Sequence, residues 1–170
     1  MDITNISCRF LSVSETHAEI GRVVEDYDNI YGLVAFDNTI GTRLGVILYT
    51  VHNNKVRIHR FIVHPDAQFS GVGKYMARVL STKYSGQTIK LYLLGYDTKT
   101  LAKLLMMGFE YVGRYHGVLP ESGVYPPPKP LGYVLEYVRN PAKVVNHEHD
   151  QLIQYMEERY EQDVFNFTIQ

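Results

Sequence analysis

The amino-acid sequence predicts a mixed α/β fold built on a mostly antiparallel sheet. Two patterns point to it. Up to residue 63, short β-rich runs alternate with turn residues and one helical segment, as in an antiparallel meander. From Pro65 onward, helical and apolar strand-sized segments alternate, which predicts that the strand after the first of these helices runs parallel to the strand before it. A chain of 170 residues with 45% hydrophobic residues can bury a core without disulfides, and its one cysteine, Cys8, cannot form an internal one.

Each element of the first part follows from its residues. Ser14 is followed by apolar residues at helical spacing, so it is expected to cap an amphipathic helix that ends near Tyr27. Asn53-Asn54 is expected to form a short hairpin connection. Alternating apolar and β-branched residues predict the strands themselves over residues 8–13, 30–36, 44–51 and 56–63.

The second part opens with Gly71 and Gly73, after which apolar residues recur at helical spacing. Asp97 can cap the next helix, which runs through Met107. A stiff loop with five prolines lies between residues 119 and 130. Buried or half-buried strands are expected over residues 89–94, 109–115 and 131–138.

Residues 140–170 are expected to form an extension of a main domain that covers residues 1–139. Asn140-Pro141 breaks the chain, a helix with one apolar face follows, and residues 164–169 alternate like a strand. A terminal strand must pair with a sheet edge or with a second subunit, so a homodimer through this extension is a further expectation.

The net charge of -1 hides an uneven distribution. Residues 1–40 carry 2 basic and 7 acidic groups, residues 41–114 carry 11 and 3, and residues 115–170 carry 4 and 8. The total argues against a nucleic-acid binder, and no apolar run approaches the ~20 residues that span a bilayer. Because the start does not resemble a signal peptide, a cytoplasmic protein without membrane or nucleic-acid partners is expected. The basic middle segment indicates a compact anionic ligand.

A glycine-containing turn lies between strand 56–63 and the following helix. Bare backbone amides and the helix dipole favour an anionic group at such a turn. A Walker loop would need glycine in place of Gln68, and a dinucleotide fingerprint would need Gly or Ala in place of Met76. Neither nucleotide-binding pattern fits.

The pattern Gln68-x-x-Gly71-x-Gly73, directly after a strand that ends in Val63, resembles the pyrophosphate loop of the GNAT superfamily of acyl-CoA-dependent N-acetyltransferases. A helix followed by Gly108-Phe109 and a strand is a second feature similar to that family. With the element order, the resemblance covers about residues 6 to 138. It implies a GNAT-like mixed sheet, mostly antiparallel, with splayed central parallel strands and flanking helices. It also implies acetyl-CoA as co-substrate, with no metal.

The resemblance further implies which residues bind the coenzyme. The CoA pyrophosphate would contact backbone amides of the loop, and the pantetheine arm would pair with the backbone of the preceding strand. The implied positions are Phe61, Ile62, Val63, Gln68, Phe69, Ser70, Gly71, Val72, Gly73, Lys74 and Asp97. Lys74, Arg78 and Lys83 would meet CoA phosphates, or else form a solvated helix face.

An amine acceptor would suit acidic side chains near the end of the first helix, at Glu25, Asp26 and Asp28, although a solvated helix end is the alternative for each of them. The segment over residues 118–130 is expected to wall the acceptor site. The candidate base is His59, because it is expected to share a strand face with Phe61 and Val63 and to have a pKa near working pH. Its position is similar to that of a strand histidine in arylalkylamine N-acetyltransferases, five residues before a Val-His like Val63-His64. A partly exposed strand histidine without a role is the alternative, and Glu110 is a weaker candidate base.

The general acid is the main departure from the family, because Leu104 stands where members usually carry a tyrosine. Tyr92, Tyr96, Tyr111 or water would then protonate the leaving thiolate, or the chain would bind CoA without efficient turnover.

Other constellations are weaker. His147-x-His149 lacks further ligands for a metal site and is read as a solvated helix start. Cys8 is read as a small core residue, and the chain lacks the Gly-x-Ser-x-Gly elbow of a hydrolase. The sequence therefore predicts an N-acetyltransferase that moves an acetyl group from acetyl-CoA to a primary amine, on a small molecule or a protein, by direct attack in a ternary complex. A noncatalytic CoA-binding or assembly module is the alternative.

Overall fold

The computed structural model describes residues 5–20, 29–68, 70–94, 98–115 and 132–137. Within these ranges, every strand and helix expected from the sequence is present. The strands are β1 (Ile6–Leu11), β2 (Tyr31–Asp37), β3 (Arg43–His52), β4 (Lys55–Val63), β5 (Thr88–Leu94), β6 (Phe109–Tyr115) and β7 (Gly132–Tyr137). The helices are α1 (Val13–Ile20), α2 (Val72–Lys83) and α3 (Thr98–Met106), with a short 3-10 turn, η3, over Pro65–Ala67.

In the described ranges, these seven strands are mostly antiparallel with one parallel pair, as the sequence predicts. The chain divides into two compact units, one up to Ile89 and one from Lys90 onward. The splay of the central strands and the boundary after residue 139 stay predictions. The expected acidic residues 25, 26 and 28, the proline-rich loop, and the whole extension over 140–170 lie outside the described residues.

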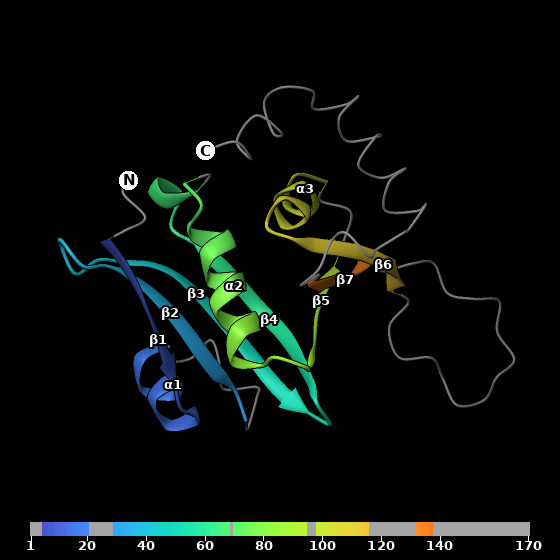
Figure 1. Cartoon of the computed structure of the whole chain (residues 1–170), viewed down its shortest axis with the longest axis horizontal. Helices are drawn as coiled ribbons and strands as arrows, with labels where there is room; N and C mark the ends of the chain where they lie inside the picture. Colours follow the sequence, from blue (N-terminus) through green and yellow to red (C-terminus); the bar gives the residue numbers. More distant parts are fainter. Residues whose placement is uncertain (1–4, 21–28, 69, 95–97, 116–131, 138–170) are drawn as a thin grey trace, which may run out of the picture. The chain divides into compact units, whose positions relative to one another are not determined.

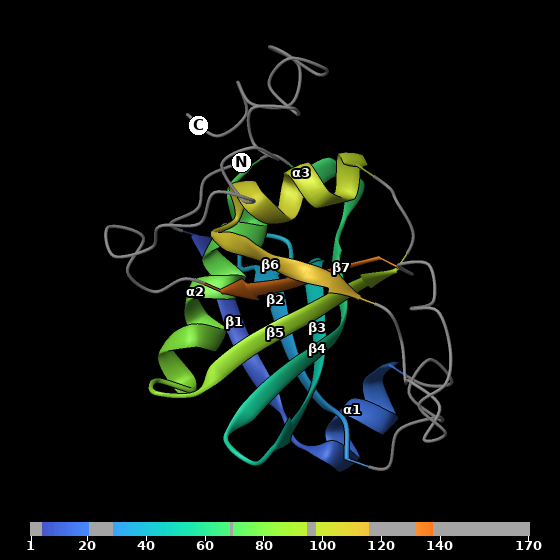
Figure 2. The ribbon, with the colours of Figure 1, turned by 90° about the vertical axis from the view of Figure 1, so that its right-hand side faces the viewer.

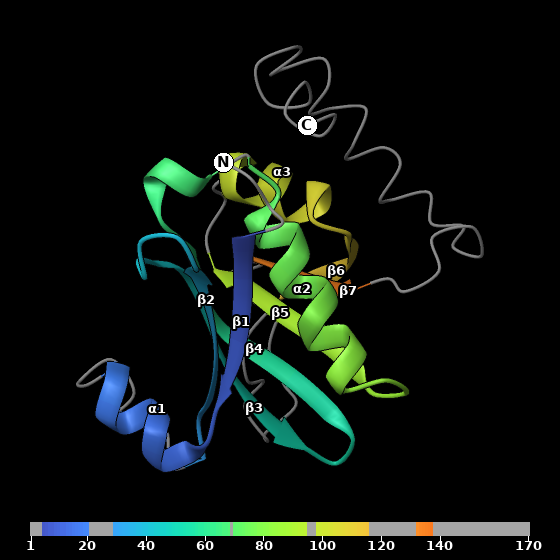
Figure 3. The same cartoon turned by 60° about the vertical axis from the view of Figure 1, so that its left-hand side comes forward.

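The first unit is an antiparallel sheet in the order β1-β2-β3-β4. Its two faces follow from the register. Gly32 of β2 lies opposite Leu48 of β3, and a Cβ on Gly32 would lie 3.2 Å from Thr16 Oγ1 of α1. Gly45, three residues before Leu48, faces the other way, and a Cβ there would lie 2.7 Å from Met76 Sδ of α2. The two helices therefore cover opposite faces of this sheet (Figures 1 and 3).

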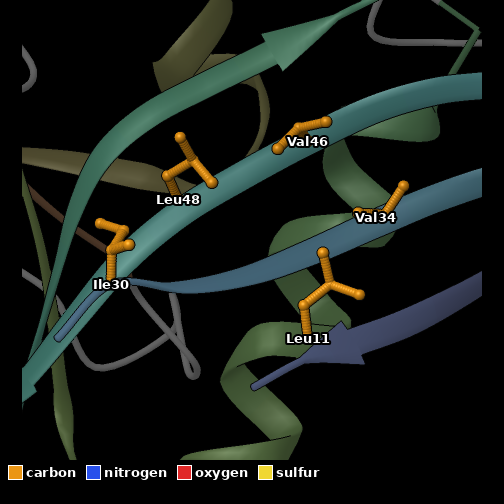
Figure 4. Packing of buried hydrophobic residues seen from close by; sticks show 5 residues of the cluster. All are labelled: Leu11, Ile30, Val34, Val46 and Leu48. Carbon is orange, nitrogen blue, oxygen red and sulfur yellow. The ribbon is translucent and has the colours of Figure 1, made fainter. Parts of the chain in front are cut away.

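The α1 face carries a compact apolar cluster. Leu11, Val34, Val46 and Leu48 come from three adjacent strands, and Ile30 joins them just before β2 (Figure 4). All five are buried, and Ile20 of α1 packs against them. Hydrophobic burial on this scale, roughly 1.5–3 kcal/mol for each fully buried large side chain, fixes the strand register.

The start of α1 differs from the expectation that Ser14 caps it. The cap is Ser12, whose Oγ accepts a hydrogen bond from the Glu15 backbone N–H at 3.2 Å. The Glu15 carboxylate in turn accepts from the Ser12 N–H, also at 3.2 Å. This reciprocal arrangement is a capping box, and it satisfies two N–H groups that Ser14 would leave unpaired.

The β3–β4 hairpin confirms the predicted Asn53-Asn54 turn. Both residues have positive φ, 49° and 61°, as a type I′ turn requires. Asparagine tolerates this conformation better than most residues, so the two-residue connection sets the register of the hairpin.

The second unit pairs β5 with β7 and β7 with β6, in each case antiparallel. Helix α3 lies along β6 (Figure 2) and contributes Leu101, Ala102 and Leu104 to the buried apolar residues. Among the helices in the described part of the chain, none combines the length and hydropathy needed to cross a lipid bilayer.

Candidate functional site

Hydrogen bonds connect the described residues of the segment that joins β4 to α2 to one another and to β3. The His64 N–H donates to the Leu44 carbonyl at 2.7 Å, which extends the β3–β4 pairing by one residue. His64 Nδ1 then accepts from the Asp66 N–H at 3.2 Å and so caps η3. The Ser70 hydroxyl donates to the Ala67 carbonyl, which closes the turn before the glycines. This loop therefore holds its shape by its own contacts.

Gly71 is the residue that turns the loop into α2. Its φ of 92° and ψ of -1° lie in the left-handed region, which side chains other than glycine rarely adopt. Within the described residues no side chain caps α2. The first N–H groups of a helix have no acceptor inside it, so those of Val72, Gly73 and Lys74 form a positive pole. Such a pole binds anions.

Gln68 contacts the end of β4, and its predicted role in coenzyme binding stays a prediction. Its side-chain Nε2 donates to the Val63 carbonyl at 3.2 Å, which ties the loop back to the end of β4. The side chain therefore braces the loop, and the Val63 carbonyl already has one donor.

The position of α2 over the sheet depends on Gly45. A Cβ at this position would lie 2.7 Å from Met76 Sδ and 3.0 Å from the Ile62 carbonyl oxygen. Met76 is fully buried, so it cannot move into solvent to make room. The missing side chain thus allows α2, and with it the helix N-terminus, to approach β3 closely.

The expected phosphate-binding cations lie at different distances from the loop. Lys74 and Arg78 are exposed and four residues apart, so they share one face of the first half of α2. Lys83 lies in the last turn, about 15 Å along the helix from Gly73, and its Nζ is 4.1 Å from the centre of the Phe10 ring. This position favours a cation–π contact with β1 over a phosphate contact. Phe69 and Asp97 lie outside the described residues.

His59 lies in a β-bulge of β4. Tyr49 pairs with Ile58 and Leu48 pairs with Arg60, so His59 is an additional residue in the ladder. Its Nε2 lies 2.8 Å from Thr50 Oγ1, and this hydrogen bond accommodates either tautomer. Thr50 and Leu48 are on the α1 face of β3, so His59 points to that face.

Two expectations for His59 are therefore corrected. Phe61 and Val63 lie opposite Ile47 and Gly45, on the α2 face, so His59 does not share their face. Its pKa is not near working pH either, because burial, and then the positive charges of Arg57 and Arg60, lower it to about 4. The imidazole is consequently neutral at pH 7.

The same register brings basic side chains together. Arg57 lies opposite Thr50 and Arg60 opposite Leu48, so both share the α1 face with His59. Both are exposed, while His59 is half-buried. We call these three residues the basic face of β4. Toward the loop, Ile62 follows on the same face with 56% of its surface exposed.

Sequence reasoning missed this arrangement although a signal for it was present. The apolar residues Val56 and Ile58 and then Phe61 and Val63 are each two apart, but Ile58 and Phe61 are three apart. That change of phase indicates one inserted residue between them.

The candidate acids and the alternative base belong to the second unit, which begins at Lys90. Leu104 is buried on α3, Tyr92 is half-buried on β5, and Tyr111 packs edge-on against Tyr133 with 5.8 Å between ring centres. Glu110 lies directly opposite Glu136 of β7. Tyr96 lies outside the described residues.

Within the part of the chain that the structure describes, neither a metal-binding cluster nor the Cys8 thiol forms a second reactive site. Among the described residues no group of three or more His, Cys, Asp or Glu side chains is placed to hold a metal ion, and His147 and His149 lie outside them. Burial raises the pKa of the half-buried Cys8 thiol to about 11, so the reactive thiolate is scarce at neutral pH.

A sheet of this topology, with a glycine turn between β4 and α2, is the GNAT fold, and known structures agree. An IAA acetyltransferase from Bacillus cereus is similar at a TM-score of 0.54 and 16% identity, over 78% of this chain and 98% of that one. A Bacillus subtilis acetyltransferase in complex with CoA is similar at a TM-score of 0.52 and 16% identity, over 78% of this chain and 97% of that one. The ribosomal-protein-S18-alanine N-acetyltransferase from Escherichia coli is similar at a TM-score of 0.52 and 12% identity, over 82% of this chain and 100% of that one.

At these identities the likeness establishes the fold. No protein-family model and no curated relative matches the sequence.

Proposed function

We propose that this protein is an N-acetyltransferase that transfers an acetyl group from acetyl-CoA to a primary amine by direct attack in a ternary complex. The observation that supports this proposal is the loop after β4, in which Gln68 bonds back to the Val63 carbonyl and Gly71 turns the chain into α2. It presents the N-terminal amides of α2 at the end of the strand that bears a neutral histidine. The similar B. subtilis protein was crystallised with CoA, and the similar E. coli protein acts on an amine, which agrees with this proposal.

The loop binds the pyrophosphate of the coenzyme. Backbone amides of Val72, Gly73 and Lys74 donate to its oxygens, and the helix dipole favours the negative charge. The pantetheine arm lies along β4 and pairs with the backbone of Phe61, Ile62 and Val63. Along an extended strand, the four residues from Val63 to His59 span about 13 Å, so the arm runs from the loop toward the basic face.

His59 acts as the general base. The amine nitrogen attacks the thioester carbonyl, a C–N bond forms, the C–S bond breaks, and the amine proton passes to the imidazole. With Nε2–H donated to Thr50, the lone pair that takes the proton is on Nδ1. A pKa of about 4 makes His59 a weak base, which suffices because attack on the carbonyl makes the amine proton acidic.

The departing thiolate takes its proton from Tyr92, Tyr111 or water, since Leu104 offers no acidic group. This gap also favours the second candidate, a noncatalytic CoA-binding or assembly module of the same fold. Homodimer formation through residues 140–170 and a cytoplasmic location stay proposals.

Two measurements test these candidates. Acetyl-CoA should raise the melting temperature of the protein, and amines should then release free thiol from acetyl-CoA. No stabilisation by acetyl-CoA would remove both candidates. Stabilisation without thiol release over a broad panel of amines would favour the noncatalytic module.

A further inference from the structure

The basic face of β4 carries two exposed guanidinium groups, those of Arg57 and Arg60. Residues 43–63, which make up β3, the turn and β4, contain no Asp or Glu that could offset these two charges. Arg60 is exposed, and none of the ion pairs among the described residues involves it. A surface with this charge repels a second cation and attracts an anion.

The bulge decides that these charges surround the candidate base. Arg57 and Arg60 are three residues apart, so in a regular strand without a bulge they would lie on opposite faces of β4. The register shift puts both on the α1 face, with His59 between them in the chain. Both arginines are close enough for their charges to lower the pKa of His59, so they lie beside the imidazole in space as well.

We propose that the acceptor is an amine whose molecule also carries an oxyanion, a carboxylate or a phosphate, and that Arg60, with Arg57, binds this oxyanion beside His59. The proposal rests on the proposed acetyl transfer and names its acceptor class. Guanidinium groups pair with carboxylate and phosphate through two parallel hydrogen bonds, which orients as well as binds the acceptor. The amine would then be presented to the imidazole, and a polyamine would be disfavoured.

Matched acceptor pairs test the acceptor class directly. Tyrosine is compared with tyramine, and O-phosphoethanolamine with ethanolamine, by thiol release from acetyl-CoA. We expect kcat/KM to be at least about 10-fold higher for the member with the oxyanion in one of the pairs, and the pair that responds distinguishes carboxylate from phosphate. Equal or faster acetylation of tyramine, ethanolamine or a diamine would overturn the inference and leave acetyl transfer standing.

The residue assignment is tested with Arg60→Gln and a matched control, Lys55→Gln, on the exposed hairpin end of the same strand. In Arg60→Gln, KM for the preferred acceptor with the oxyanion should rise about 10-fold, with KM for its partner without the oxyanion unchanged. Lys55→Gln should change neither. An equal rise for both members would mean that Arg60 only supports the strand, and would overturn its assignment.

A binding measurement covers the case in which no acceptor turns over. The CoA-saturated protein should be stabilised against heat by tyrosine or by O-phosphoethanolamine, and Arg60→Gln should lose this stabilisation. If CoA binds but neither compound stabilises the protein, the inference fails. If CoA itself does not bind, the proposed function fails first.

Discussion

Two parts of β4, its carboxyl end and its central bulge, are candidate binding sites of different construction. At the carboxyl end, the loop is built from backbone: Gly71 supplies the turn, and the amides of α2 supply the donors. At the bulge, the site is built from side chains, with Thr50 on the neighbouring strand holding His59 and two arginines beside it. The loop can be recognised from a pattern in the sequence, whereas the group of side chains at the bulge comes together only when β3 and β4 pair.

This difference determines which substitutions the loop and the bulge each tolerate. A backbone site depends on small residues and on φ, so it is damaged by added atoms. A side-chain site depends on charge and hydrogen bonding, so it is damaged by removed groups. Changes at the loop should therefore alter coenzyme binding, and changes at the bulge should alter turnover.

The largest effect is expected at the loop. Replacing Gly73 by valine adds a branched side chain to a buried position in the first turn of α2 and blocks the approach of the pyrophosphate to the amides. Acetyl-CoA affinity should fall about 100-fold, or about 2.7 kcal/mol, by calorimetry. Gly113→Val is the control, because a Cβ there meets nothing within 4 Å and lies in the other unit. Unchanged affinity in Gly73→Val would place the pyrophosphate elsewhere.

At the bulge, His59→Gln should lower kcat while leaving acetyl-CoA affinity almost unchanged. The loss of a general base costs about 100-fold in kcat, measured by thiol release at saturating substrate. The matched control is His52→Gln, an exposed histidine on the same hairpin, which should behave like wild type. A kcat for His59→Gln equal to that of the control would remove His59 as the base.

A third change asks whether the loop depends on its support by the sheet. Gly45→Ala places a Cβ 2.7 Å from Met76 Sδ, so α2 must shift or Met76 must leave its rotamer. Overpacking of this kind lowers the free energy of unfolding by roughly 1–3 kcal/mol, which urea denaturation would detect. Gly113→Ala should cost far less. If Gly45→Ala is as stable as that control, α2 does not rest on β3 as tightly as the contact implies.

The smallest effect is a pH dependence of stability that belongs to the bulge. The pKa of His59 is about 4 in the folded chain, below the ordinary value of about 6.5, so the unfolded chain takes up this proton first as the pH falls. As the pH falls from about 6.5 to about 4, the titration of His59 therefore progressively lowers the free energy of unfolding. His59→Gln should lose less melting temperature over this window than wild type, by a few degrees. Parallel curves for the two proteins would mean that His59 keeps an ordinary pKa.

Much of the fold could be predicted because its signals are local. Alternation, apolar runs, Asn53-Asn54 and the glycines each act within a few residues, and the elements they predict are present in the described residues. The cap of α1 was misplaced by two residues, since Ser14 is as good a capping residue as Ser12 and only the reciprocal bond with Glu15 distinguishes them. The role of His59 as the base stays a prediction, while the face and the pKa predicted for it were wrong.

The sequence by itself determined the order of elements and the glycine loop, because backbone conformation near glycine and the dipole of a helix are short-range properties. The tertiary structure decided what stands beside His59. A β-bulge is a mismatch between two strands, so whether a side chain points to one face or the other depends on how β3 and β4 pair. Only that pairing brings Thr50, Arg57 and Arg60 to the imidazole, whose pKa is lowered to about 4 by burial and then by the two positive charges.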